Sequence, residues 1–324
     1  MKRIALLVPK GDVMPNAVIG AYFLLTQANY FLMLQGREPI FEIKILGYKK
    51  HMLLYDGSFS VKTDSFKKAE QVFDLILVPG FTCEMEEPIR LNRKMIEWMK
   101  IQHLQHGSEL ASMCTGGFLL ASTGLLRGKA CTLHWAFESS FRKMFPDVDF
   151  QSDSITTDDN GIYTSGGAYS SLNLILYLIE KFGSKDIALM VSRFFQLDHN
   201  RKSQKPFVIF NQQKVHADLE IQQSQEYIEK HFSKPITVSD LAGSFSISRR
   251  NFIRRFKSAT GNTPSEYIQR VRIEAAKRLI ESSSIRMGEL GPQTGYRDDK
   301  SFRIIFKKHT GFSPSEYKRR FGRV

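Results

Sequence analysis

The chain has 324 residues, which is long enough for two domains that each bury their own core. Its hydrophobic fraction of 42% and charged fraction of 24% are those of ordinary globular proteins and exclude gross disorder. The net charge of +13 favours a polyanionic partner, and three cysteines without Cys-x-x-Cys spacing (Cys83, Cys114 and Cys131) exclude a fully paired disulfide framework. Because the first apolar run is also too short for a signal peptide, we expect a reduced, cytoplasmic protein without a metal or other cofactor.

The N-terminal two thirds of the chain alternate between short apolar runs and longer helical patterns. Residues 4–8 and 75–78 are continuous apolar runs closed by Pro or Pro-Gly, as buried parallel strands usually are. Further strands are predicted at 41–46, 110–113 and 162–164, and helices at 17–34, 91–106, 117–125 and 170–181. This order predicts an α/β domain with a doubly wound parallel sheet.

One segment of this domain places a cysteine before two glycines: residues 112–118 read Ser-Met-Cys-Thr-Gly-Gly-Phe. Because it lies between a predicted strand and a predicted helix, we expect Cys114 on a sharp strand-to-helix turn. There the helix N-terminus and free backbone N–H groups favour a thiolate or a nearby anion. Cys114, Thr115 and Gly116 are therefore candidate ligand-binding residues, although a small buried hydrophobe is the alternative role for Cys114.

The sequence around this turn, with Val78-Pro-Gly80 before it and Thr132-Leu-His134-Trp135 after it, resembles the PfpI-type, class I glutamine-amidotransferase-like fold. More narrowly, residues 2–207 resemble the sensor domain that precedes AraC-type helix-turn-helix regions in one subgroup of regulators. That resemblance implies that His134 lines the same pocket as Cys114. It also implies dimerisation and a nitrogenous effector such as an amino acid or a quaternary amine.

Catalysis by Cys114 requires a base within hydrogen-bond reach. PfpI-type hydrolases carry a His directly after the Cys, and this chain has Thr115 there. Related hydratases carry an acid after the first strand, where this chain has Ala17, although Asp12 is close in sequence. His134 is the only obvious partner left. We therefore expect no catalytic residue and an inactive, amidotransferase-like sensor domain.

Charge changes after about residue 215. Residues 216–324 hold 21 Lys and Arg against 12 Asp and Glu, a net of +9, whereas residues 1–215 have a net of +4. We expect a sensor domain at 1–207, a semi-ordered linker at 208–217 and a DNA-binding domain at 218–324 that opens with a helix over 220–231. Residues 207–210, Phe-Val-Ile-Phe, are apolar enough to pack on either side.

The last third of the chain contains one pattern twice, fifty residues apart, in residues 252–267 and 302–317. In each copy two Phe at i and i+4 share a helix face opposite cationic residues, and a Thr-Gly pair follows. The Gly suits the left-handed position that ends a helix. Thr263 and Ser313 are then expected as N-caps, followed by Pro at the first helical position and Glu at the third.

A shorter helix is predicted before the first basic helix. Residues 237–240, Thr-Val-Ser-Asp, predict its start, and a turn at 246–248 leads to Ser248 as the N-cap of the basic helix. Two helices joined by a short turn form the helix-turn-helix geometry that enters a major groove. Residues 220–321 resemble the tandem helix-turn-helix domain of AraC/XylS transcriptional regulators, with the Thr-Gly-x-x-Pro-Ser-Glu-Tyr signature present twice. One helix over 265–282 is expected to space the two units. Two amphipathic hairpins with merely solvated cations are the alternative.

The residues predicted to contact DNA lie opposite the Phe pairs. In the first unit they are Arg249, Arg250, Asn251, Arg254 and Lys257; in the second they are Lys300, Arg303, Ile304 and Lys307. Arginine suits bidentate contact with guanine. Ile304 is apolar, and Gly291-Pro292 is expected to interrupt the helix before the second basic helix. We therefore predict that the second unit contributes less to sequence specificity than the first.

The sequence thus predicts a sequence-specific, DNA-binding transcriptional regulator that responds to a small metabolite. The alternatives are an amidase- or hydratase-like cysteine enzyme with an appended nucleic-acid-binding module, and a nucleoid-binding protein without a ligand. The expected partners are promoter or operator DNA, the effector, a second copy of the chain and, for an activator, RNA polymerase. No membrane partner is expected.

Overall fold

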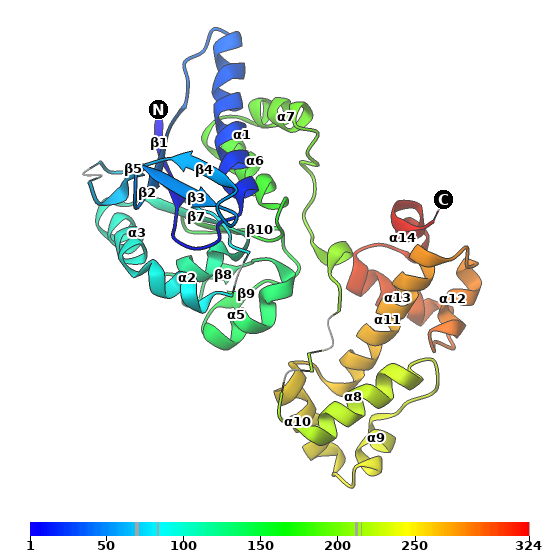
Figure 1. Cartoon of the computed structure of the whole chain (residues 1–324). Coiled ribbons are helices and arrows are strands. Elements are labelled where there is room, and N and C mark those ends of the chain that lie inside the picture. Colours follow the sequence, from blue (N-terminus) through cyan, green and yellow to red (C-terminus); the bar gives the residue numbers. More distant parts are fainter. Residues whose placement is uncertain (69–70, 83, 211–212, 215, 324) are drawn as a thin grey trace. The chain divides into compact units, whose positions relative to one another are not determined.

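The computed structural model describes residues 1–68, 71–82, 84–210, 213–214 and 216–323, so Cys83 lies outside the described residues. The chain forms two compact units, Met1–Gln204 and Lys205–Val324 (Figure 1). The first is an α/β unit and the second is all-α, which confirms the predicted fold classes. Cys114 and Cys131 are both buried, free thiols.

A seven-stranded sheet forms the centre of the first unit, in the order β10-β11-β7-β6-β1-β2-β5. Its strands are β1 (Lys2–Val8), β2 (Phe41–Gly47), β5 (Asp64–Ser65), β6 (Leu75–Val78), β7 (Glu109–Met113), β10 (Thr156–Asp159) and β11 (Ile162–Ser165). The sheet grows in both directions from β1, where Ile4 pairs with Ile43 on one side and Leu75 on the other. Only the edge pair of β10 with β11 is antiparallel among the described pairs of this sheet, so the doubly wound prediction is confirmed.

Helices cover the sheet. Figure 1 shows α1 (Pro15–Leu34), α6 (Ser171–Phe182) and α7 (Lys185–Phe194) together on one side of it. The other helices are α2 (Glu86–Leu91), α3 (Arg93–His106), α4 (Gly117–Ala121) and α5 (Glu138–Met144). Two short pairs, β3 (His51–Leu54) with β4 (Phe59–Lys62) and β8 (Ala130–Cys131) with β9 (Asp149–Phe150), complete the unit. Helix α7 and these short pairs were not predicted from the sequence.

Helix α1 is apolar on more than one side. By length and composition alone it would suffice to cross a membrane. In the fold, however, one stripe of the helix lies in the core of the α/β unit. That stripe consists of Ala17, Val18, Ala21, Leu24, Leu25, Ala28 and Leu32.

The second unit contains seven helices among its described residues. They are α8 (Leu219–His231), α9 (Val238–Ser244), α10 (Arg249–Thr260), α11 (Pro264–Ser282), α12 (Met287–Gln293), α13 (Asp299–Thr310) and α14 (Pro314–Phe321). They build two separate hydrophobic cores, one around Phe252 and Phe256 and one around Phe302 and Phe306. Helix α11 contributes to both, through Val271 to the first core and Ile273 to the second. It is therefore the structural link between the two helix-turn-helix halves.

Residues expected in a linker instead pack on the helical unit. Phe210 is buried in the first helical core, with its ring 5.1 Å from that of Tyr267. The Lys277 ammonium donates to the Val208 carbonyl at 2.7 Å. The apolar residues in this stretch explain the packing, because burying them removes apolar surface from water.

One expectation about the second half was wrong. Gly291 and Pro292 do not interrupt the preceding helix, because α12 runs through them and ends at Gln293. Pro292 lies in the last turn, where it costs only one backbone hydrogen bond. Gly291 is buried, and a side chain added there would touch the Phe302 ring at 3.6 Å.

Candidate nucleic-acid interface and ligand site

The helix boundaries that position the basic helices follow from local sequence. Ser248 accepts a hydrogen bond from the Asn251 amide and so begins α10, while Asp298 accepts from the Ser301 amide and begins α13. Gly261 and Gly311 follow these helices with φ of +71° and +78°, as helix-ending glycines do. Both predicted capping boxes are present, Thr263 with Glu266 and Ser313 with Glu316.

The two copies of the repeat also share their interior contacts. Thr260 and Thr310 each donate to the carbonyl four residues earlier at 2.8 Å, which fixes the end of each basic helix. The signature tyrosines are buried and each donates to a glutamate: Tyr267 to Glu229 at 2.9 Å, and Tyr317 to Glu281 at 2.6 Å. Burial, followed by the neighbouring carboxylate, raises the pKa of both phenols, so both remain donors at neutral pH.

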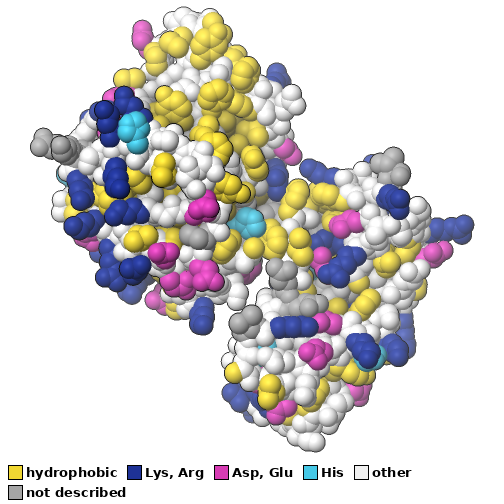
Figure 2. Space-filling view, viewed as in Figure 1, with side chains coloured by type: hydrophobic (Ala, Val, Ile, Leu, Met, Phe, Trp, Pro, Cys, Tyr) yellow, Lys and Arg dark blue, Asp and Glu magenta, His cyan; other side chains and the backbone are white. Residues whose placement is uncertain are grey.

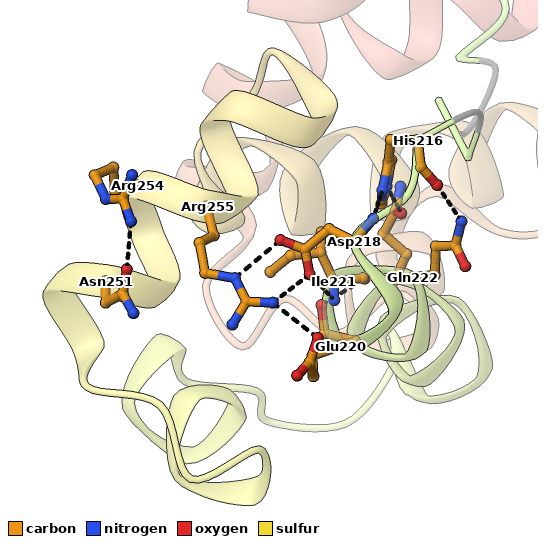
Figure 3. A network of polar contacts seen from close by, with 10 residues as sticks. His216, Asp218, Glu220, Ile221, Gln222, Asn251, Arg254 and Arg255 are labelled. Carbon is orange, nitrogen blue, oxygen red and sulfur yellow. Dashed lines mark hydrogen bonds and ion pairs between the residues drawn. The ribbon is translucent and has the colours of Figure 1, made fainter.

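Helix α10 presents a cationic face to solvent. Arg249, Arg250, Arg254 and Lys257 are exposed, while Asn251 is half-buried. The Arg254 guanidinium has no carboxylate partner among the described ion pairs and donates to the Asn251 side-chain oxygen at 2.8 Å (Figure 3). Because an amide does not neutralise a guanidinium, this pair keeps its positive charge for a ligand.

The neighbouring Arg255 faces the opposite way, toward α8. Figure 3 shows its guanidinium between Asp218 and Glu220, at the start of α8. It donates to Asp218 through Nε at 2.9 Å and Nη2 at 2.5 Å, and to Glu220 at 2.8 Å. The Arg255 hydrogen bond holds the pKa of Asp218 below its usual value, and Asp218 also caps α8 by accepting from the Ile221 amide. This set of ion pairs, the Arg255 clamp, was not predicted from the sequence because its partners lie 35 to 37 residues apart.

Helix α13 presents a different face. Lys300, Arg303 and Lys307 are exposed, and Ile304 is 60% exposed in their midst. Arg303 is paired with Asp299 at 2.8 Å, four residues earlier on the same helix. A guanidinium partly neutralised by its own helix has less charge available for a phosphate or a base.

A further feature, not predicted from sequence, lies between the two helix-turn-helix halves. Arg272 of α11 donates to the carbonyls of Phe232 and Lys234 at 2.8 and 2.9 Å, and its guanidinium lies over the Tyr296 ring. A cavity of about 490 Å³ opens beside them and is lined also by Ser233, Pro235, Ile236, Thr237, Pro292, Gly295 and Arg297. Arg272 thereby joins the end of α8 to α11 and to the turn after α12.

In the α/β unit, Cys114 directly follows β7 and begins a short 3₁₀ turn, Cys114–Gly116, that leads into α4. Its φ of 53° is unusual for a residue other than glycine. Thr115 fixes the turn by donating to the Phe81 carbonyl and accepting from the Phe81 amide. Gly116 is required by close packing, because a side chain there would meet the Val78 carbonyl at 2.5 Å.

The protonation state of the Cys114 thiol differs from the thiolate that was expected. Cys114 is only 2% exposed, and burial raises the pKa of its thiol to about 11 despite hydrogen bonds from Thr115. The thiol is therefore protonated at neutral pH, because burial outweighs the turn's N–H groups.

The structure gives His134 its own surroundings. Its Nδ1 accepts from the Ala136 amide at 3.2 Å, its ring lies against Trp135 and Phe137, and burial lowers its pKa. Among the residues that the structure describes, no hydrogen bond or ion pair joins it to Cys114. The hydrogen-bonded base that a nucleophilic cysteine requires is not formed by these two side chains.

Comparison with known proteins matches both units. A family model described as a helix-turn-helix domain matches residues 241–320, and one described as the DJ-1/PfpI family matches residues 42–181. The HTH-type transcriptional regulator GbdR of Pseudomonas aeruginosa is 25% identical over 95% of this chain and 86% of its own length. The HTH-type transcriptional regulator CdhR of the same species is 26% identical over 83% and 81%.

Solved structures resemble the α/β fold. A putative transcriptional regulator from Vibrio parahaemolyticus has a TM-score of 0.51 and 22% identity, covering 60% of this chain and 98% of its own. An AraC family transcriptional regulator from Pseudomonas putida has a TM-score of 0.50 and 17% identity, covering 60% and 100%.

The two units and the relatives therefore support a DNA-binding transcriptional regulator of the helix-turn-helix type. More particularly, the chain combines a segment that matches the DJ-1/PfpI family model with a segment that matches the helix-turn-helix domain model.

Proposed function

We propose that this regulator reads DNA mainly through α10 and uses α13 chiefly to hold the phosphate backbone. The observation that supports this is the difference in exposed charge between the two helices. Arg250, Arg254 and Lys257 form an exposed cationic face free of carboxylates among the described ion pairs, whereas Arg303 is paired with Asp299 and Ile304 carries no charge. Arginine reads guanine through two parallel hydrogen bonds, and a lysine or a paired arginine suits a phosphate better.

The test compares single-residue variants on cognate and random DNA. We expect Arg254→Ala to weaken cognate binding by about 1–3 kcal/mol and to relax the preference at one base position. Arg303→Ala should weaken binding about equally on both DNAs. Arg278→Ala, which removes an exposed cation from α11, controls for net charge. Equal losses on cognate and random DNA for Arg254→Ala, or a greater loss of selectivity for Arg303→Ala, would overturn the assignment.

We propose further that the DJ-1/PfpI-type domain binds a small metabolite beside the Cys114 turn, through Thr115, Gly116 and His134, and has no catalytic activity. Strained backbone concentrates at functional turns, and the φ of Cys114 is a strain of this kind. A protonated thiol without a hydrogen-bonded base suits a binding site better than a nucleophile. The resemblance of residues 2–207 to the sensor domain of one subgroup of regulators supports a nitrogenous effector, such as an amino acid or a quaternary amine.

A thermal-shift screen against such metabolites tests this site, because a ligand that binds only the native state raises apparent stability. We expect a stabilising ligand for the wild type and a weaker shift for Cys114→Ala. Thr123→Ala, which changes another buried residue of the same region, is the matched control. Turnover of an amide or nitrile that Cys114→Ala abolishes would instead establish an enzyme.

The remaining parts of the proposal concern assembly. We propose a cytoplasmic homodimer whose two copies occupy paired sites, because paired half-sites mirror the two-fold symmetry of helix-turn-helix dimers. Contact with RNA polymerase applies if the regulator activates. We propose that the domain boundary lies between residues 204 and 218, which the division of the compact units after Gln204 and the start of α8 at Leu219 support.

A further inference from the structure

The cavity between the two helix-turn-helix halves has walls from both of them. Residues in the loop after α8 (233 and 235–237) form one side, and residues at the end of α12 and in the next turn (292 and 295–297) form the other. Figure 1 shows this loop beside the end of α12. Arg272 of α11 contacts both sides, through hydrogen bonds to the loop and through the Tyr296 ring. Its volume of about 490 Å³ is in the range of about 300–1,000 Å³ that small-molecule sites have.

Tyr296, in the wall of this cavity, has a hydroxyl without a partner. The residue is only 8% exposed, and its hydroxyl is buried and has no hydrogen-bond partner among the residues that the structure describes. Its ring packs against that of Phe302 at 5.3 Å, in the second helical core. Burial raises the pKa of the phenol to about 12, so the hydroxyl is a donor at neutral pH. A buried donor without an acceptor is costly, and beside a cavity it indicates an acceptor that a ligand supplies.

The cations of the cavity lack acidic partners. Arg272 donates to two backbone carbonyls and lies over the Tyr296 ring, so neither contact neutralises its charge, and burial lowers its pKa. Arg297 is exposed and has no ion pair among the described residues. None of the described residues that line the cavity is Asp or Glu. Lys and Arg side chains are spread over the helical unit (Figure 2), so positive charge alone does not distinguish this place. Its coincidence with a buried, unpartnered hydroxyl does.

We propose that this cavity binds a small organic anion, a carboxylate joined to a short apolar body, at a site separate from the one beside the Cys114 turn. The carboxylate accepts from the Tyr296 hydroxyl and is attracted by Arg272 and Arg297, because a hydroxyl donor and two guanidinium groups suit a carboxylate. The body contacts the apolar lining residues, which are Pro235, Ile236 and Pro292.

Occupancy of this site would affect DNA binding. Because the walls belong to both halves, a bound anion favours the arrangement in which both walls reach it. That arrangement also sets the position of α10 relative to α13, so the anion and a DNA site that contacts both helices alter each other's affinity.

A phosphate of the DNA backbone is the competing occupant, and it fits less well. A group that reaches the Tyr296 hydroxyl must enter the cavity, whereas a duplex holds its phosphates on its outer edge. A phosphate also has no apolar body to contact Ile236 and the two prolines.

Isothermal titration calorimetry of the full chain with hexanoate tests the proposal. Hexanamide is the neutral match, and inorganic phosphate is the anion without an apolar body. We expect saturable binding of hexanoate, with hexanamide and phosphate about tenfold weaker or more. Tyr296→Phe should weaken hexanoate binding about tenfold, because it removes a hydrogen bond to a charged group and keeps the ring. Arg297→Gln should weaken it about threefold, as expected for an exposed ion pair. Arg278→Gln, which removes an exposed cation of α11 outside the cavity lining, should bind like the wild type.

The stability of Tyr296→Phe without ligand tests the premise. Because the removed hydroxyl has no partner, the variant should be at least as stable as the wild type in urea. A less stable variant would mean that the hydroxyl is bonded in the folded protein, and would overturn the proposal.

Four binding results would also overturn it. They are no saturable binding of hexanoate, equal binding of hexanamide, hexanoate binding unchanged in Tyr296→Phe, and hexanoate binding that Cys114→Ala abolishes. The last result would place the anion in the α/β unit. A preference for phosphate, with a loss of DNA affinity in Tyr296→Phe, would assign the cavity to the DNA backbone instead. None of these outcomes depends on which helix reads the bases, so the test is separate from that of the proposed function.

Discussion

The two helix-turn-helix halves have the same interior and different surfaces. At positions fifty residues apart, Phe256 matches Phe306 and Tyr267 matches Tyr317, each in the same packing and with the same kind of carboxylate partner. On the outside, however, Arg254 corresponds to Ile304, and the clamping Arg255 corresponds to half-buried Ile305. The comparison shows that a repeated unit can keep its interior while positions outside that interior diverge.

The first helices of the two helix-turn-helix units, α9 and α12, differ in their local stabilisation. Thr237 caps α9 by accepting from the Asp240 amide, whereas Arg286 precedes α12 without a side-chain cap. Helix α12 also contains two glycines and a proline, which are poor helix formers. The second half thus depends more on its core than on local helix stability.

Truncation of a core side chain is expected to have the largest effect on the free energy of unfolding. Phe256→Ala and Phe306→Ala each remove a fully buried ring and should lower the free energy of unfolding by about 3–5 kcal/mol. Because the two cores are separate, hydrogen exchange should accelerate mainly in the half that carries the substitution. Uniform acceleration across α8 to α14 would mean that the halves unfold as one.

The turn at Gly295 should tolerate substitution poorly. Its φ is +86°, and an added Cβ would lie 2.6 Å from the Phe232 carbonyl and 3.0 Å from the Arg272 guanidinium carbon. We expect Gly295→Ala to destabilise the helical unit by about 1–3 kcal/mol, measured by urea denaturation. Gly243→Ala is the matched control, because Gly243 lies in α9 with open space around it. It should be neutral or stabilising by up to ~1 kcal/mol, and an equal loss from both substitutions would contradict the steric argument.

The Arg255 clamp exists in the first half alone among the described ion pairs, and its removal should be sensitive to pH. Arg255→Ala is expected to lower the free energy of unfolding by about 1–2 kcal/mol at pH 7, because the side chains of Arg255 and Asp218 are about three quarters buried. Asp218 has a lowered pKa in the folded state, so its contribution is present above the unfolded value of about 3.9 and is lost as pH falls through the folded value.

The stability difference between wild type and Arg255→Ala should therefore stay constant above about pH 5 and shrink below about pH 4. Thermal unfolding over that pH range measures it. Ile305→Ala, at the corresponding position of the second half, should show a difference that does not vary with pH. A pH-independent difference for Arg255→Ala would remove the ion pair as its cause.

The smallest effect, on DNA affinity, is expected from a substitution that gives α13 the arginine found at the corresponding position of α10. Ile304→Arg adds an exposed cation to α13 and should tighten binding to any DNA at low salt. The slope of log affinity against log salt should steepen by about 1. Ile304→Gln, which is polar and uncharged, should leave the slope unchanged. A steeper slope for both variants would show that the charge at this position is not what matters.

The sequence predicted what depends on near neighbours. Caps such as Thr263 with Glu266 and helix ends such as Gly261 are set by residues three or four positions apart, so a single sequence contains the whole signal. The order of strands and helices was also predictable, since buried strands are continuous apolar runs.

Features that depend on distant residues were not predictable. The bond from Arg255 to Asp218 and the bonds from Arg272 to the end of α8 join residues more than 35 positions apart, and no local pattern indicates them. The state of the Cys114 thiol depends on burial by the whole domain, which outweighs the turn's own N–H groups. Helix α12 passes Pro292 because tertiary packing of Gly291 on Phe302 overrides local propensity.

Helix α11 belongs to both cores, and this has a consequence for affinity. In the proposed mode of DNA binding, α10 occupies one groove and α11 holds α13 at a fixed separation from it, so the second contact is intramolecular. Its effective concentration is then set by a rigid connection and not by the concentration of protein in solution. Weak, unselective binding of DNA by α13 would therefore still raise the affinity of the whole chain for its site. An exposed Ile304 and an Arg303 paired with Asp299 are thus compatible with a sequence-specific regulator.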